Sequence, residues 1–443
     1  MDKSDFYPYL ITWGFVTAIL VWRAWKRPGA GLVLSYCFQL TMLYALSGVL
    51  HSLSWTDLPD NEFVLIGIEK STNGLVAFAI GSLAIGPLLA ARMRKDSERA
   101  MKPDLTLPRL FILFGVIFYF VVAPTLGRVN GFNAIGAVGS QLVVVGISLN
   151  CWRAWSTGGA KKLLPAIAPA LLLPVATLVL QGFLSFGIIA LSTVVLFSAQ
   201  FFRPRWLLLV SGLIFGYLGL TLYGSYMRDR VANREIVWSG QPLAARVAGF
   251  QKTLSTTEWF DFTDPDHLGF VDDRLNQNVL VGNAVTYLSN TGNYAYGSTL
   301  VEAVMNMVPR LIWPSKPTTA GSFGLAARFT GLEFAQGTSV GIGPVIELYG
   351  NFGDPGIWIG FFILGALIQA MDTMAGFHLM NGTWLDFANW YLVGISFLNV
   401  SGSFVECSAG AVASLALIRS MTYVLKRTRH NKLLRQRAAL LAG

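Results

Sequence analysis

The stretch MVPRLIWPSKPTTAG, residues 307–321, combines two cations with three prolines and no carboxylate. A guanidinium group such as that of Arg310 matches phosphate oxygens in a bidentate fork, and a lysine such as Lys316 adds a compact charge. The prolines restrict the backbone and favour a fixed presentation of both cations. The stretch therefore predicts a site for a phosphate-rich group. Alternatively, both cations reach lipid phosphates beside an interfacial helix, and Trp313 is either an interfacial anchor or a platform for a sugar.

Four of the other arginines between residues 227 and 355 are further candidates for the site. Arg228, Arg230 and Arg234 follow directly after a long apolar run, and Arg274 closes an aspartate-rich segment. Arg230 and Arg234 are four residues apart, so they share a face if the preceding helix continues. A cluster of arginines and lysines at the outer face of a bilayer suits a polyanionic headgroup, so these arginines are predicted to assist in binding one.

Two residues are candidates for a general base. Glu347 lies in an otherwise apolar, glycine-rich stretch, where burial would make its carboxylate a stronger base. The alternative for Glu347 is a helix cap or an ion-pair partner. His267 is the second candidate, although exposed loop histidines are common.

An acidic segment surrounds His267, with aspartates at positions 264, 266, 272 and 273. These aspartates lack the spacing of a calcium-binding loop. A solvated acidic loop is the favoured interpretation, and no metal site is predicted.

The elements that must position these residues are membrane helices. The chain is 53% hydrophobic and 13% charged, whereas a soluble chain carries about 25% charged residues. Runs long enough to span a bilayer lie at 7–24, 30–50, 74–91, 108–126, 132–150, 163–180, 183–201, 206–226, 356–375, 386–402 and 407–425. The sequence thus predicts an all-α polytopic membrane protein with about eleven transmembrane helices.

Four regions follow from these runs. They are an N-terminal bundle of about eight helices (1–226), a large loop region with the predicted site (227–355), about three C-terminal helices (356–425) and a basic tail (426–443). The first run lacks a basic leader and a cleavage site, so it is expected to be a retained helix rather than a signal peptide.

The distribution of cations predicts the orientation. Alternate short connections and the tail hold twenty Lys and Arg residues, and the opposite connections hold three. The positive-inside rule then places the N-terminus and the 227–355 region outside and the C-terminus in the cytoplasm. The net charge of +9 is explained in this way and does not indicate nucleic acid. No nucleotide-binding motif is present, so no cofactor is expected.

The order PR-x-x-WP-x-KP, then E-x-Y-x-NFG-x-x-G, resembles the O-antigen polymerase (Wzy-type) family of oligosaccharide repeat unit polymerases. The matching positions here are Pro309-Arg310, Trp313-Pro314, Lys316-Pro317, Glu347, Tyr349, Asn351-Phe352-Gly353 and Gly356. Arg310 and Gly321 also fit the R-x₁₀-G signature of that family's periplasmic loops. The chain departs from the family at the outer hairpin near Gln181, where a basic residue is often found.

The resemblance implies a GT-C-like, metal-independent glycosyltransferase of the bacterial inner membrane. It would join oligosaccharide repeats carried on undecaprenyl pyrophosphate at the periplasmic face of that membrane. Its partners would be the lipid-linked oligosaccharide, the lipid bilayer and a chain-length regulator protein. Arg310, Lys316, Glu347 and His267 would then act at the reacting centre. Arg228, Arg230, Arg234, Arg274, Trp313, Tyr349 and Asn351 would bind substrate.

Three alternatives stay open. An O-antigen ligase or protein O-oligosaccharyltransferase would use similar outer arginines. A transporter or flippase of lipid-linked oligosaccharide would instead place paired charges or broken helices at mid-membrane, whereas this chain concentrates its polar groups in one outer segment. A membrane scaffold without a site is the last alternative. The sugars, the linkage and the final polysaccharide do not follow from the sequence.

Overall fold

A computed structural model describes the chain except residues 1, 28, 95–103, 123–124, 126–132, 183, 204, 309–311, 314, 318–320, 336–337, 339 and 442–443. Every regular element in the described ranges is helical. The first eight elements are η1 (Lys3–Phe6), α1 (Tyr7–Lys26), α2 (Leu32–Leu40), η2 (Thr41–Ala45), α3 (Leu46–Ser52), α4 (Asn61–Ile80), η3 (Gly81–Ile85) and α5 (Gly86–Arg94). The next seven are α6 (Leu107–Ile117), η4 (Phe118–Val122), α8 (Asn133–Ile167), η5 (Ala168–Leu171), α9 (Leu172–Gln181), α10 (Ser185–Ala199) and α11 (Trp206–Arg228).

Six shorter helices follow, and three helices close the chain. The short helices are α12 (Arg230–Trp238), α13 (Leu243–Ser255), α14 (Pro265–Leu275), α15 (Asn278–Thr291), α16 (Ser298–Asn306) and α17 (Gly321–Thr330). The closing helices are α18 (Gly343–Met380), α19 (Trp384–Ser396) and α20 (Phe404–Leu441).

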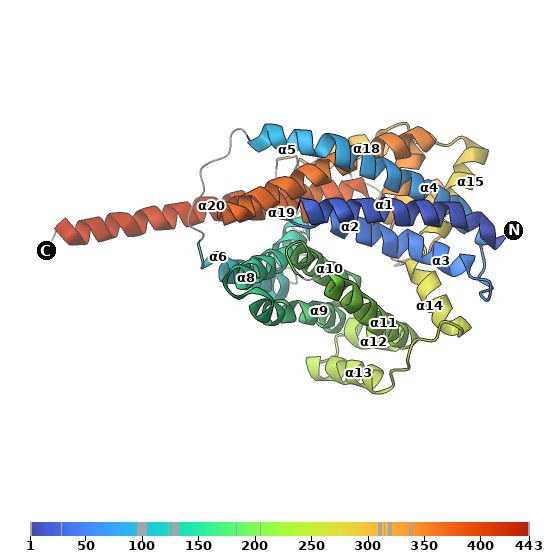
Figure 1. Cartoon of the computed structure of the whole chain (residues 1–443), viewed down its shortest axis with the longest axis horizontal. Helices are drawn as coiled ribbons and strands as arrows, with labels where there is room; N and C mark the ends of the chain where they lie inside the picture. The colour runs from blue at the N-terminus through green and yellow to red at the C-terminus, as the bar shows by residue number, and fades with distance from the viewer. Residues whose placement is uncertain are drawn as a thin grey trace.

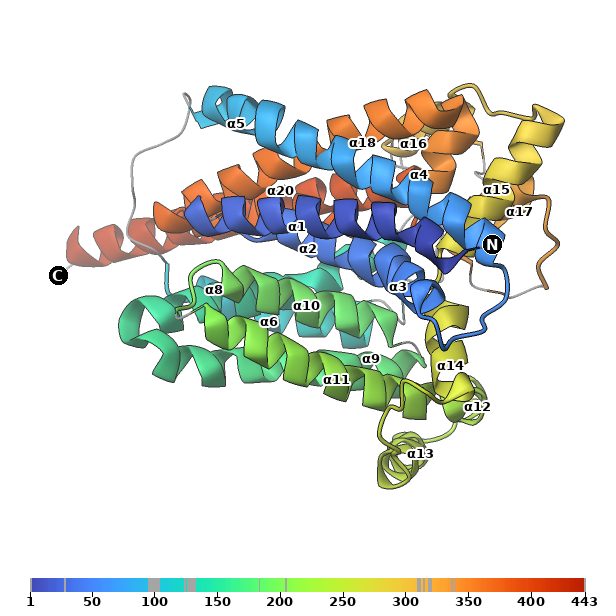
Figure 2. The same ribbon diagram turned by 45° about the vertical axis from the view of Figure 1, so that its right-hand side comes forward.

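The helices form two groups that run in roughly the same direction. One group holds α1 to α5 with α18, α19 and α20, and the other holds α6 to α11 (Figures 1 and 2). The N-terminus and the short helices α12 to α15 lie toward one end of the molecule, and α20 projects from the other end (Figure 1). The two ends are therefore different in structure, as expected for a protein with distinct outer and inner faces.

Six described helical segments are long and apolar enough to cross a membrane. They are Leu32–Ser52, Asn61–Met93, Val138–Leu180, Trp206–Arg228, Gly343–Met380 and Phe404–Leu425, with shorter apolar helices at Leu107–Val122 and Phe186–Ala199. This supports a polytopic membrane protein, because each of the six exceeds the roughly 17 residues needed to span the hydrocarbon. The count of eleven spans and the GT-C-like architecture stay predictions.

Helix boundaries differ from the predicted ones in several places, and two of these are early helix starts. The predicted run 74–91 belongs to a helical segment that begins at Asn61, and the predicted run 356–375 belongs to α18, which begins at Gly343. In both cases the added turns carry polar or glycine-rich sequence that lies against other helices, as Gly67 does at Asn278 of α15 and Gly350 does at Phe329 of α17. Hydropathy cannot detect such turns, since it marks lipid-facing length and not helix ends.

The motif NFG-x-x-G produces a break inside α18. Phe352 and Gly353 have non-helical backbone angles, with φ of 63° at Gly353, and Pro355 follows. The left-handed conformation favours glycine because glycine has no Cβ, and proline is well tolerated in the first turn of the helix that resumes. The motif thus divides α18 into a short segment before the break and a long one after it.

Candidate active site

Three guanidinium groups gather where α11 ends. Arg230 and Arg234 lie on α12 and Arg274 lies on α14, and both helices pack against α11. Burial, followed by the positive charge of Arg230, lowers the pKa of Arg234, and the charge of Arg274 adds to that shift. Neither Arg230 nor Arg274 forms a hydrogen bond or an ion pair with another described residue. The structure thus brings together three of the predicted binding arginines, and two of them are left without a carboxylate partner among the described residues.

Arg234 also reaches the hairpin between α9 and α10. Its Nε donates to the carbonyl of Gly182 at 3.3 Å, and its guanidinium lies 5.1 Å from the centre of the Trp238 ring. The resemblance places a basic residue at this hairpin, where the sequence has Gln181 instead. The guanidinium of Arg234 therefore supplies positive charge to the hairpin from another element.

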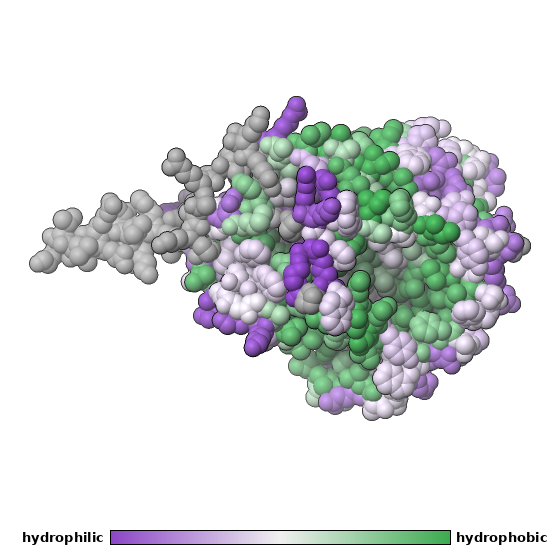
Figure 3. Space-filling model, in the orientation of Figure 1, coloured by the Kyte–Doolittle hydropathy of each residue, from purple (hydrophilic) through white to green (hydrophobic). Residues whose placement is uncertain are grey.

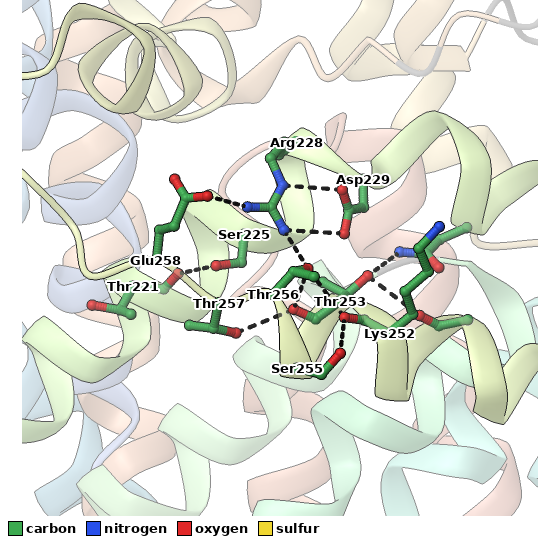
Figure 4. Close-up of polar contacts among 12 residues, drawn as sticks. Thr221, Ser225, Arg228, Asp229, Lys252, Thr253, Ser255, Thr256, Thr257 and Glu258 are labelled. Atoms are coloured by element: carbon green, nitrogen blue, oxygen red, sulfur yellow. Dashed lines mark hydrogen bonds and ion pairs between the residues drawn. The ribbon is translucent and has the colours of Figure 1, made fainter.

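Arg228 differs from these three because its charge is already balanced (Figure 4). Its guanidinium donates to Asp229 Oδ1 at 3.1 Å, to Glu258 Oε1 at 3.1 Å and to the Thr256 hydroxyl at 2.7 Å. The bond from Arg228 is the main reason that the pKa of Asp229 is lowered. A phosphate could bind Arg228 only by displacing these acceptors, so Arg228 is better suited to fixing the start of α12.

Lys316 is buried against the end of α16 and does not face open solvent. Its ammonium group donates to Asn306 Oδ1 at 2.6 Å and to the carbonyl of Val308 at 3.0 Å. A cation at a helix C-terminus is favourable because the last carbonyls are unpaired and carry partial negative charge. Lys316 therefore anchors the loop after α16. Arg310 belongs to this loop but lies outside the described residues, and Trp313 is 36% exposed.

Glu347 is fully buried in the first segment of α18 and holds the start of α20. Its Oε2 accepts a hydrogen bond of 2.8 Å from the backbone amide of Phe404, the first residue of α20. Its Oε1 is buried without a hydrogen-bond partner among the described residues. The unpaired amides of a helix N-terminus favour such an acceptor. In this conformation Glu347 therefore caps the N-terminus of α20, and a helix cap is one of the roles that the sequence left open for it.

The first turn of α20 is also capped by its own residues. The Ser403 hydroxyl accepts from the amide of Glu406 at 3.4 Å, and Glu406 Oε2 accepts from the amide of Ser403 at 3.3 Å. This reciprocal pair is a capping box. Glu406 Oε1 also accepts from the hydroxyl of Ser322 on α17 at 2.8 Å. The N-terminus of α20 is thus a junction of α17, α18 and α20.

Tyr349 and Asn351 are buried residues that hold helices together. Asn351 accepts from the amide of Gly297 at 2.9 Å and donates to the Thr299 hydroxyl and the Glu347 carbonyl, both at 2.7 Å. The Tyr349 hydroxyl lies 3.3 Å from that of Ser289. In this conformation the amide of Asn351 is fully used by protein partners, so it connects α16 to α18 rather than presenting itself to a sugar.

His267 lies on α14 beside the arginine cluster, with one nitrogen already occupied. Its Nδ1 accepts from the backbone amide of Asp261 at 3.0 Å, and its ring stacks on Phe260. A base would have to use the other nitrogen, which carries the proton in the neutral tautomer that accepts at Nδ1. The neighbouring Asp264 caps α14 by accepting from the amide of Asp266 at 2.9 Å. Among the described residues no group of three or more His, Cys, Asp and Glu side chains is arranged to hold a metal ion.

A buried histidine that the sequence analysis missed fastens α14 to the bundle. His51 Nε2 lies 3.0 Å from Asp272 Oδ1, and its Nδ1 lies 2.7 Å from Asn61 Oδ1. Asn276 also donates to Asp272 Oδ1 at 2.9 Å. The network ties α3, α4 and α14 together and so positions Arg274. The sequence does contain a sign of this role: His51 is a polar residue that directly follows the predicted apolar run 30–50.

The predicted residues thus fall into two groups at the same end of the molecule. The arginine cluster lies on α12 and α14. Glu347, Tyr349 and Asn351 lie in the first segment of α18, and Lys316 lies against the end of α16. Gln277, just after α14, donates to the carbonyl of Gly341, just before α18, at 2.6 Å. This bond joins the ends of the elements that carry the two groups.

Comparisons with known proteins agree with the resemblance. Two curated O-antigen polymerases, from Salmonella typhimurium (strain LT2) and Salmonella typhi, are each 29% identical to this chain over 139 residues. The match covers 31% of this chain and 32% of each relative, so it spans about a third of their length. No solved structure matches the chain. Residues 71–386 match a family described as a domain of unknown function, DUF8712. Because this match includes most of the chain, the protein belongs to the DUF8712 family.

Proposed function

We propose that this protein is a glycosyltransferase that polymerises oligosaccharide repeats carried on undecaprenyl pyrophosphate, at the periplasmic face of the bacterial inner membrane. The observation that carries the proposal is the cluster of Arg230, Arg234 and Arg274. Arg230 and Arg274 have no carboxylate partner among the described residues, and Arg234 adds its positive charge to theirs. Several guanidinium groups on one helical scaffold favour a ligand with several negative charges. The similarity to O-antigen polymerases supplies the class of reaction.

The reaction can be written in full. A hydroxyl of the incoming repeat attacks the anomeric carbon of the growing chain, a new glycosidic bond forms, and the bond from that carbon to the pyrophosphate breaks. The pyrophosphate leaves on its lipid with the bonding electrons, and a base receives the hydroxyl proton. Fixed cations lower the barrier because they stabilise the charge that develops on the leaving group. No nucleotide is needed, since the lipid pyrophosphate is already an activated leaving group.

The residues take different roles in this proposal. Arg230, Arg234 and Arg274 bind the pyrophosphate, and Arg310, which the family resemblance singles out, is proposed to take the same role. Glu347 is the candidate base. Because its carboxylate is buried against the first turn of α20, that turn must shift before a sugar hydroxyl can reach the carboxylate. His267 is the alternative base, beside the arginine cluster.

Charge removal tests the arginine cluster. We expect Arg274→Gln and Arg230→Gln each to lower polymerisation about 10²–10³-fold, the magnitude typical of losing one preorganised donor to a developing oxyanion. The measurement is the chain-length distribution made by purified protein from a synthetic undecaprenyl-pyrophosphate-linked repeat. Lys252→Gln removes an exposed cation from the same region and is expected to leave chain length unchanged. Normal polymer from Arg274→Gln would contradict the proposal.

A deletion strain separates this function from ligation. Loss of a polymerase leaves single repeats on the final acceptor. Loss of a ligase leaves long chains on the lipid carrier. We expect the deletion strain to carry single repeats on the final acceptor. Reintroducing the wild-type gene should restore long chains, and reintroducing the Arg310→Ala gene should not.

A further inference from the structure

A cavity of about 440 Å³ lies between α1, α2, α5 and α18, at the end of α1 that is away from the N-terminus of the chain. Asp372 on α18 lines the cavity. It lies eighteen residues beyond Asp354, which follows the break in α18, and eighteen helical residues span about 27 Å. Arg23 and Arg27 line it from the end of α1. Figure 3 shows a group of hydrophilic side chains over this end of α1, beside a surface that is largely apolar.

The cavity holds more positive than negative charge. Neither the guanidinium of Arg23 nor that of Arg27 forms a hydrogen bond or an ion pair with a described residue. The single carboxylate of the lining, Asp372, accepts from the backbone amides of Ala30 at 3.0 Å and Leu32 at 2.7 Å. Its charge is therefore directed at the connection between α1 and α2 rather than at the two arginines.

A buried, unpartnered amide side chain also lines the cavity. Gln200 is 2% exposed, and neither its Nε2 nor its Oε1 has a hydrogen-bond partner among the described residues. Leaving such groups unpaired is costly, so a ligand with polar atoms would be stabilised here. The nearby Gln369, by contrast, is already bonded to Ser82 and Thr373.

We propose that this cavity binds the phosphate group of an anionic lipid. The two guanidinium groups would hold the phosphate oxygens, and the Gln200 amide would bond an ester or headgroup oxygen. Apolar side chains of α1, α2 and α5 complete the lining, which suits the first carbons of an amphiphile better than a free ion. The lipid is a phospholipid or a polyprenyl phosphate, which share this chemistry. The inference does not depend on glycosyl transfer.

Lipid titration of the purified full chain, followed by native mass spectrometry, tests the proposal. Phosphatidylglycerol and undecaprenyl phosphate are the two lipid probes, diacylglycerol is the phosphate-free control, and inorganic phosphate is the lipid-free control. We expect the chain to bind one or both phosphate-bearing lipids, with the tighter one identifying the source. Arg23→Gln/Arg27→Gln should weaken that binding at least about tenfold.

Matched variants guard against a simple folding defect. Lys26→Gln removes a neighbouring cation that stacks on Trp22 and lies outside the cavity lining, and it should bind lipid as the wild type does. Gln200→Met keeps the side-chain volume and removes both unpaired atoms, so it should raise the melting temperature while weakening lipid binding. Equal binding of diacylglycerol, binding of inorganic phosphate alone, or unchanged affinity in both the double arginine variant and Gln200→Met would each overturn the proposal.

Discussion

At the residue scale, the side chains that most resemble catalytic groups are already bonded within the fold. Glu347 accepts the first amide of α20, Lys316 holds the end of α16, and Asn351 bridges α16 and α18. By contrast, the guanidinium groups of Arg230 on α12 and Arg274 on α14 have no hydrogen-bond or ion-pair partner among the described residues. Positive charge without a carboxylate partner is therefore the better guide to a substrate site here than similarity to a motif.

Substitution of Glu347 separates its capping role from a role as base. Glu347→Gln keeps an oxygen that can accept the amide of Phe404, so stability should change little. If Glu347 is the base, this variant should still lower polymerisation about 10²-fold or more. Glu347→Ala should cost about 1–3 kcal/mol of unfolding free energy in addition, because the Phe404 amide then lacks its acceptor. Thermal unfolding, monitored by tryptophan fluorescence, measures the change in stability, and chain-length analysis measures polymerisation. Full activity of Glu347→Gln would assign the base elsewhere.

At the element scale, the apolar runs were predictable, and several helix ends were not. Each predicted run overlaps a described helix, since long apolar stretches have few other structures available in a bilayer. The break at Gly353 follows from the local motif, whereas the turns of α18 before the break bond to another part of the chain, as Asn351 does to the amide of Gly297. The arginine cluster was predicted as residues, but its assembly depends on the packing of α12 and α14, which hydropathy does not encode.

The docking of α14 gives a test at this scale. His51→Leu leaves the buried Asp272 without its histidine partner, so we expect a loss of about 1–3 kcal/mol and shorter polymer, because Arg274 lies two residues after Asp272 on the same helix. Thermal unfolding in detergent measures the first effect.

The double variant His51→Leu/Asp272→Leu provides the control. Removing both polar partners is usually far less costly than removing one, so stability should recover relative to His51→Leu. An unchanged melting temperature in His51→Leu would show that the network does not hold α14 in place.

At the scale of the whole molecule, the two ends carry different groups. The arginine cluster and the junction at α20 lie toward the end that holds the N-terminus, and the cavity with Arg23 and Arg27 lies toward the other. A polymerase with this arrangement would handle its substrate on one side of the membrane and contact lipid phosphate on the other.

Site-directed labelling tests the predicted orientation. The three native cysteines, Cys37, Cys151 and Cys407, are all buried. They should therefore react little with a maleimide, and labelling of a single introduced cysteine can be measured. Ser239→Cys and Ser315→Cys should react with a membrane-impermeant maleimide in intact spheroplasts. Ser156→Cys, in a connection predicted to be cytoplasmic, should react only after permeabilisation. The reverse pattern would place the arginine cluster in the cytoplasm.

The break in α18 also has a consequence for how insertions are tolerated. Each residue added to a continuous helix rotates everything beyond it by about 100°. An insertion between Glu347 and Asn351 would therefore turn the carboxyl group away from Phe404 while the amide of Asn351 stayed with Thr299. At Gly353 the helical phase is already interrupted, so an extra residue there can be taken up locally, and each half of α18 keeps its own partners.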